Sequence, residues 1–393
     1  MTRKKYIILS LVLLMLLLIT PNKSYALMPT ELREGVQHTI EDTNLQEWNM
    51  LFNSLPEDVR TLWGSQNLKT LVSDYALGEG GFWGSALEKG IREMFKNALP
   101  QLIPLILQLL TVAILSGFLR AMGDAGMSGL NDIAGFVCQC FAICIALSSF
   151  LSLIMLSRET IEQTSTFIEL SFPLLLTLLT AAGGITSAGI FQPAMSMLCS
   201  GVTIALQNVV LPVTLTGGVM GVLNNITGRV QLGQFFNLSK SVAKWLIGLL
   251  FTLYSGVTTL QGMSAATFDG ISVRTAKFAL DKLVPIVGGM VSGTVDTMLG
   301  CAVLVKNAVG LLAIILAFSI ACIPLMRIGV GMLAFRFAAA VCEPIADPRL
   351  PKMLASLADV LTYLFAATVS LSVMFMITVG LVMSTGNTVF AGG

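Results

Sequence analysis

The sequence predicts an all-α polytopic membrane protein, with a signal peptide, a small exported helical domain and about seven or eight transmembrane helices. Of its 393 residues, 55% are hydrophobic and only 11% are charged, and the mean hydropathy is +0.82. A soluble domain carries roughly 25% charged residues. Apolar windows of about 20 residues recur from residue 100 onward, and each is long enough to cross a bilayer as a helix.

The first 26 residues have the pattern of a secretory signal peptide. Arg3, Lys4 and Lys5 precede the apolar run 6–19, and Ser24 and Ala26 supply small residues for a cleavage site. A positive start, a short apolar core and a small-residue exit are typical of a cleaved leader. The alternative is an uncleaved anchor helix, and in both cases the following residues begin outside the membrane.

Residues 27–99 form a segment of soluble character, with eleven acidic and six basic side chains. Pro56 followed by Glu57 and Asp58 suits the first turn of a helix, because proline fits there and acids favour the positive end of the helix dipole. We expect a small exported acidic helical domain that leans on the membrane or on a partner, since some 70 residues cannot bury a deep core.

Residues 100–393 form the predicted multi-spanning membrane domain. The apolar windows lie near 100–119, 133–156, 168–187, 191–222, 245–263, 284–305, 308–326 and 357–384. Eight spans put the loops 264–283 and 327–356, with Arg336, in the cytoplasm, and put Lys240 and Lys244 outside. The resulting excess of basic residues inside has the sign of the positive-inside rule.

Several predicted spans are interrupted by proline or glycine, as at Pro173, Pro212 and Pro324. Broken helices bring backbone groups into the membrane cavities of many transporters and channels. Ordinary membrane helices are also rich in both residues, so the pattern leaves a pore and a packed bundle open.

The stretch 261–310 combines charge, glycine and membrane-grade hydrophobicity. Asp296 lies in a segment otherwise apolar enough to cross a bilayer, and an acid at that depth usually faces protein or water. The candidate pore or packing residues are Asp296, Pro285, Gly288, Gly289 and Gly293. The candidate partner or interfacial segment carries Asp269, Arg274, Lys277 and Lys306. The alternative is a polar loop followed by an ordinary packed helix.

Composition and motifs also exclude several classes of function. The net charge is +1 and no basic run lies outside the N-terminus, so we expect no nucleic-acid partner. The sequence contains no phosphate-binding loop, HExxH zinc motif, nucleophile elbow or dinucleotide fingerprint. The seven cysteines all fall in apolar segments and are expected to be buried small hydrophobes. We therefore expect no enzymatic activity, cofactor or metal.

Several long motifs, in order along the chain, resemble the stage III sporulation protein AE family of endospore-forming bacteria. They are PLLLTLLTAAGGITSAGIFQPA (173–194), QNVVLP (207–212), QGMSAATFDGISVRTAKF (261–278), VPIVGG (284–289), VLVKNAVG (303–310), ACIPLMRIGVGML (321–333) and FAAAVCEPIAD (337–347). The resemblance implies a multi-pass protein of the mother cell membrane around the forespore, with its N-terminal domain in the intermembrane space. It implies a channel or secretion-like complex with other stage III A proteins and a forespore membrane partner, and it supplies no catalytic residues.

Two other functions remain open from the residues themselves. A self-sufficient permease for a small solute is favoured by Asp296, the broken spans and the charged loop 264–283. An intramembrane enzyme would have only Asp269 and Asp296 as acids, in no paired motif.

Overall fold

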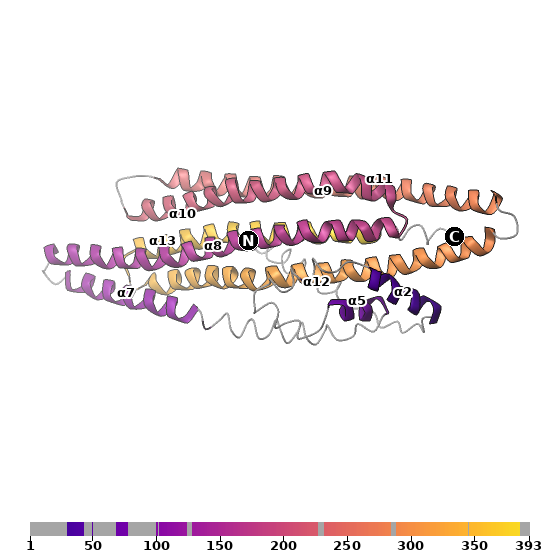
Figure 1. The fold of residues 1–393 in the computed structure, drawn as a ribbon. Helices are drawn as coiled ribbons and strands as arrows, with labels where there is room; N and C mark the ends of the chain where they lie inside the picture. Colours follow the sequence, from indigo (N-terminus) through magenta and orange to yellow (C-terminus); the bar gives the residue numbers. More distant parts are fainter. Residues whose placement is uncertain are drawn as a thin grey trace.

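The computed structural model describes residues 30–42, 49, 68–77, 100, 102–123, 128–226, 232–283, 288–344 and 346–385. All regular elements in these ranges are helices, and they pack side by side into a long bundle (Figure 1). The helices are α2 (Thr30–Asp42), α5 (Leu68–Ala76), α7 (Leu102–Gly123), α8 (Ser128–Ala181), α9 (Ile185–Ala205), the π-helix η1 (Leu206–Val210), α10 (Leu211–Ile226), α11 (Gly233–Leu283), α12 (Gly288–Cys342) and α13 (Arg349–Ser384).

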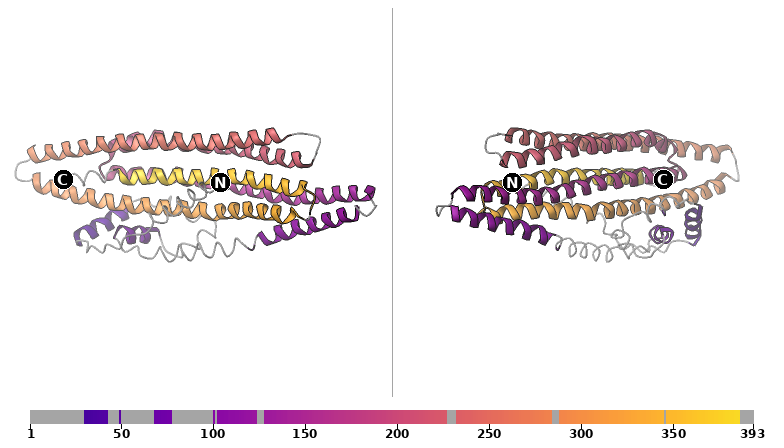
Figure 2. Two further views of the ribbon diagram at one scale, coloured as in Figure 1. Left: turned by 180° about the vertical axis from the view of Figure 1, so that it is seen from behind. Right: turned by 60° about the vertical axis from the view of Figure 1, so that its left-hand side comes forward.

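The bundle has three layers, and α13 lies at its centre. One layer holds α9, α10 and α11, the middle layer holds α8 and α13, and the third holds α7 and α12 (Figures 1 and 2). Helix α13 contacts α8, α10, α11 and α12. Most of its buried side chains are apolar, and Phe375 meets Phe167 of α8 edge to face with ring centroids 5.5 Å apart. The last long helix of the chain therefore forms the core that the other helices cover.

Five of the described helical segments are long and apolar enough to cross a membrane, by length and composition: Phe136–Ala181, Ile185–Asn225, Gly233–Gly262, Gly293–Cys342 and Arg349–Ser384. Large apolar side chains such as Phe136, Met155 and Trp245 are more than half exposed on the outside of the bundle. Apolar residues facing outward fit a helical protein that is solvated by lipid.

The predicted count of seven or eight spans is not confirmed, because neighbouring windows join into single helices. The window 133–156 and most of the window 168–187, as far as Ala181, lie in α8, which is 54 residues long. The windows 284–305 and 308–326 both fall on α12, which begins at Gly288 and is 55 residues long. Polar side chains at 157–169 and at Lys306 lower the local hydropathy. They leave the backbone N–H groups in place, so they do not break a helix.

Glycine and proline interrupt the helices at fewer places than the sequence predicts. Helix α8 ends before Gly183, whose φ of 89° is accessible to glycine with little strain. Pro173 and Pro324 lie inside continuous helices. Pro212 is the second residue of α10, just after η1, where the wider π-helical turn replaces the regular hydrogen bonds that a proline disrupts.

Two short helices of the N-terminal region, α2 and α5, pack on α12. Val36 of α2 and Leu71 of α5 are fully buried, and the Cys301 thiol of α12 lies 3.8 Å from the Leu32 carbonyl oxygen. The predicted signal peptide and most of the predicted domain 27–99 lie outside the described residues.

Candidate functional site

Polar side chains of α13 bind each of its four neighbouring helices. The Thr368 hydroxyl lies 2.8 Å from that of Ser157 on α8, and the Thr378 hydroxyl lies 2.6 Å from that of Tyr254 on α11. Further along α13, Ser356, Asp359 and Thr362 meet α10, α11 and α12, in the pairs Asn225–Ser356, Lys240–Asp359 and Arg336–Thr362. Hydrogen bonds between helices fix their register in a membrane, where apolar packing alone specifies it weakly.

Charged side chains of α11, α12 and α13 form a cluster around Asp359. The Lys240 Nζ lies 2.6 Å from the Asp359 Oδ2, and the Arg336 Nη2 lies 3.6 Å from the Asp359 Oδ1. The same Arg336 nitrogen donates a hydrogen bond to the Thr362 hydroxyl at 3.3 Å. Asp359 and Thr362 are three residues apart on α13 and so share a helix face.

The Lys240 ammonium is held from a second direction by an aromatic ring. It lies 4.7 Å from the ring centroid of Phe236, one helical turn earlier on α11. A cation over an aromatic face is attracted by the negative charge of that face. Lys240 is therefore fixed by both the carboxylate and the ring.

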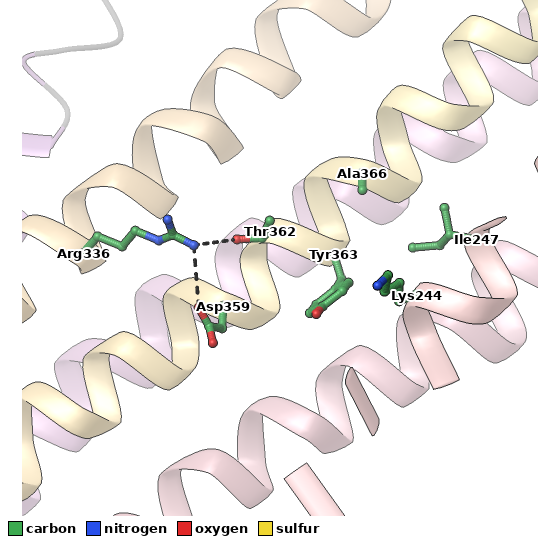
Figure 3. Close-up of a pocket in the computed structure, with 7 residues that line it drawn as sticks. All are labelled: Lys244, Ile247, Arg336, Asp359, Thr362, Tyr363 and Ala366. Carbon is green, nitrogen blue, oxygen red and sulfur yellow. Dashed lines mark hydrogen bonds and ion pairs between the residues drawn. The ribbon is translucent and has the colours of Figure 1, made fainter. Parts of the chain in front are cut away.

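A pocket of about 330 Å³ opens beside this cluster. It is lined by Lys244, Ile247, Arg336, Asp359, Thr362, Tyr363 and Ala366 (Figure 3). Lys244 and Ile247 come from α11, Arg336 from α12, and the other four from α13. Cationic, carboxylate, hydroxyl and apolar groups therefore face one space between three helices.

The cluster corrects the topology expected from the sequence. Lys240 and Arg336 were predicted on opposite sides of the membrane, yet both contact the carboxylate of Asp359. Because α12 runs without a break over two predicted spans, two long helices separate these residues where the sequence predicts three spans.

Lys306 is a second polar site, at the other end of α13. Its side chain is fully buried, and its ammonium donates hydrogen bonds to the Met383 carbonyl at 3.0 Å and to the Thr385 carbonyl. These carbonyls belong to the last turn of α13 and to the residue that caps it, where no later residue of the helix can bind them. In this position Lys306 links α12 to the carboxyl end of α13, and its role as a partner or interfacial residue stays a prediction.

The predicted pore or packing residues lie near the start of α12. Asp296 is half-buried, and Gly293 is exposed with no atom within 4 Å of a Cβ added to it. Gly293 therefore makes no close helix contact among the described residues. Gly288 and Gly289 begin α12, and Pro285 lies outside the described residues. The structure does not join any of these residues to the charged cluster.

Asp269, Arg274 and Lys277 lie in the last part of α11. The structure describes the backbone there and not these side chains, so their role as a partner or interfacial segment stays a prediction. Asp359 is absent from the residues predicted from the sequence, and Lys240 and Lys244 were predicted only as basic residues of an outer loop. The sequence does contain a pattern that marks these residues. Lys240 and Lys244 lie just before the charge-free run 245–268 on α11, and Asp359 lies just before the charge-free run 360–385.

Comparison with known proteins identifies the relatives of this chain. The family model of stage III sporulation protein AE matches residues 66–386. The curated stage III sporulation protein AE of Bacillus subtilis (strain 168) is 30% identical over 260 residues, which make up 66% of this chain and 65% of that relative. No solved structure matches the chain.

Proposed function

Because the chain belongs to the stage III sporulation protein AE family, we propose that it is a membrane subunit of the channel or secretion-like complex that joins the mother cell to the forespore during endospore formation. The family match over residues 66–386 is the observation that carries this proposal. Its proposed partners are the other stage III A sporulation proteins and a protein of the forespore membrane.

The physical character of the chain supports a membrane subunit with no catalytic role. Five described segments are long and apolar enough to span a bilayer, and polar contacts link α13 to its neighbours. The sequence carries none of the common catalytic motifs. A scaffold or a conduit wall needs what is present here, namely a fixed arrangement of helices.

We place the chain in the mother cell membrane that surrounds the forespore, with residues 27–99 in the intermembrane space. The leader-like residues 1–26 support export of the segment that follows them. Helices α2 and α5 lie against α12 near Cys301, far along α12 from Arg336. This arrangement lets the N-terminal region and the basic cluster face opposite sides of one membrane.

Gene deletion in the native sporulating organism tests the proposal, with forespore integrity and late forespore gene expression scored after engulfment. Deletion is expected to arrest development, and the wild-type gene is expected to restore it. Normal spores after deletion would refute the role. Restoration with Asp296→Asn, at wild-type protein levels, asks whether the membrane acid contributes.

A self-sufficient permease is the second candidate, and the half-buried acid Asp296 favours it. Such a protein would move a small solute after purification and reconstitution alone into vesicles. Uptake that requires the partner proteins would support the complex instead.

A further inference from the structure

We propose that the pocket between α11, α12 and α13 binds the headgroup of an anionic phospholipid, with the phosphate held by Lys244 and Arg336. The proposal does not depend on the sporulation complex. It rests on the charge of the pocket, its position along the helices and the chemistry of its lining.

The cluster has more positive than negative charge. Lys240 and Arg336 contact the carboxylate of Asp359, and Lys244 lines the pocket beside it. The cluster therefore has a surplus of two positive charges, and the residues that line the pocket itself have a surplus of one. The 2.6 Å contact with Lys240 occupies one oxygen of that carboxylate, and the 3.6 Å contact with Arg336 is a looser pair. No carboxylate of the described residues lies within ion-pair distance of Lys244. A phosphate oxyanion would supply the missing negative charge and would form charge-assisted hydrogen bonds.

The pocket lies where two parallel helices change from charged to charge-free. The pairs Lys240–Asp359 and Tyr254–Thr378 show that α11 and α13 run in the same direction. After Lys244, α11 carries no charged residue over 245–268, and after Asp359 no charge occurs on α13. The first run is 24 residues long, so it measures about 36 Å as a helix, which exceeds the hydrocarbon core of about 30 Å.

Two nearby side chains support a membrane–water boundary at this level. Trp245 directly follows Lys244 and is 66% exposed, as expected of aromatic residues at the headgroup level. On α12, which runs the other way, the charge-free run 307–326 ends at Arg327, nine residues before Arg336. Arg327 therefore lies deeper than Arg336, and the long side chain of an arginine can extend from that depth to the interface.

The lining suits a lipid better than free phosphate. Thr362 and Tyr363 bring hydroxyl groups beside the cations, while Ile247 and Ala366 give the same pocket an apolar wall (Figure 3). A headgroup phosphate with the start of an acyl chain can contact both the polar groups and the apolar wall, whereas inorganic phosphate can contact only the polar groups. Basic pockets between membrane helices are typical sites for anionic headgroups. The volume of about 330 Å³ is at the lower end of small-ligand sites, which begin at roughly 300 Å³.

Native mass spectrometry of the detergent-purified full chain tests the proposal. The chain is titrated with phosphatidylglycerol and, separately, with phosphatidylcholine of the same acyl chains. We expect at least tenfold preference for the anionic lipid. Lys244→Gln is expected to lower that affinity about tenfold, and Arg336→Gln should lower it as well. Lys352→Gln is the matched control, because this exposed lysine of α13 does not line the pocket; it should bind like the wild type.

Three results would overturn the proposal. One is equal affinity for the two lipids, and another is anionic-lipid binding that Lys244→Gln leaves unchanged. The third is release of the bound lipid by millimolar inorganic phosphate in the wild type, which would mark a site for a soluble anion. Lys244→Gln is the decisive variant, since Lys244 is exposed and has no ion pair among the described residues, so its replacement is compatible with folding. Circular dichroism of each variant checks that the helices remain.

Discussion

The Lys306 ammonium holds the carboxyl end of α13 against α12. Its partners, the carbonyls of Met383 and Thr385, have no other donor within the helix. Lys306→Met keeps the length of the side chain and removes the donor. We expect hydrogen exchange at the Thr385 amide, which binds the Leu381 carbonyl, to accelerate at least tenfold. Each carbonyl left without its donor costs about 1–3 kcal/mol, and fraying of the helix end exposes both carbonyls to water.

Lys352→Met provides the control for this experiment, because it removes an exposed lysine at the other end of α13. Exchange at Thr385 should then match the wild type. The same acceleration in both variants would show that Lys306 does not act through the carboxyl end of α13.

The ion pair of Lys240 with Asp359 can be measured by a double-mutant cycle with Lys240→Met and Asp359→Asn. The carboxylate is 43% exposed, so water screens the pair and the coupling should be about 0.5–1 kcal/mol. Unfolding midpoints in detergent provide the measurement. Coupling should fall as salt is added, because partly exposed charges are screened. Additive effects of the two substitutions would show that the short contact contributes nothing to stability.

At this scale the sequence identified charged residues but not their contacts. Asp296 is a predicted site residue because it lies in an apolar segment, whereas Asp359, at the edge of the predicted span 357–384, was not predicted as one. The structure gives Asp359 two cationic partners from helices far apart in the chain. Such pairing depends on how α11, α12 and α13 are placed side by side, which a single sequence does not specify.

Among the helices, α10 approaches α8 through a glycine. A Cβ added to Gly218 would clash with the ring of Phe150, which is fully buried and cannot move aside. Gly218→Ala should lower stability by about 1 kcal/mol, because overpacking costs about 1–3 kcal/mol and the gain from removing a helical glycine is about 0.5–1 kcal/mol. Thermal unfolding in detergent measures the change.

Gly201 on α9 is the matched control for this substitution. No atom lies within 4 Å of a Cβ added there, and the position is exposed. Gly201→Ala should therefore raise stability by about 0.5–1 kcal/mol through helix propensity alone. A loss of stability at both glycines would contradict the steric account of Gly218.

The sequence predicted the helical class of each apolar segment but not where one helix ends and the next begins. The break at Gly183 needs a positive φ, which glycine adopts with little strain. The joins in α8 and α12 have no such marker, because charged side chains lower hydropathy without removing hydrogen bonds. Hydropathy windows therefore divided two continuous helices.

For the whole molecule, the shared partner Asp359 fixes one end of the bundle. Lys240, Lys244, Arg327, Arg336, Arg349 and Lys352 all lie toward this end. By the positive-inside rule we expect it to face the cytoplasm. Single cysteines introduced by Ser241→Cys and Lys352→Cys, in a cysteine-free chain, should both react with an impermeant reagent from that side.

Met298→Cys tests the other side of the membrane in the same labelling experiment. Met298 is 68% exposed and lies near Cys301, where α2 packs on α12. It should react from the outer side. Labelling of positions 241 and 352 from opposite sides would restore the topology expected from eight spans and would contradict the continuity of α12.

The continuity of α8 is the remaining difference between the sequence-based expectation and the structure. A helix of 54 residues is about 81 Å long, more than twice the hydrocarbon thickness of a bilayer. Spin labels at Phe136 and Thr177, both exposed, should therefore lie about 60 Å apart. Two antiparallel spans at 133–156 and 168–187 would bring the same labels within about 30 Å, the thickness that both would share. Labels at Phe136 and Met155 provide the control, because both arrangements predict about 28 Å for that pair. A short 136–177 distance in lipid would show that α8 folds back at its charged segment 158–169, as hydropathy alone predicts.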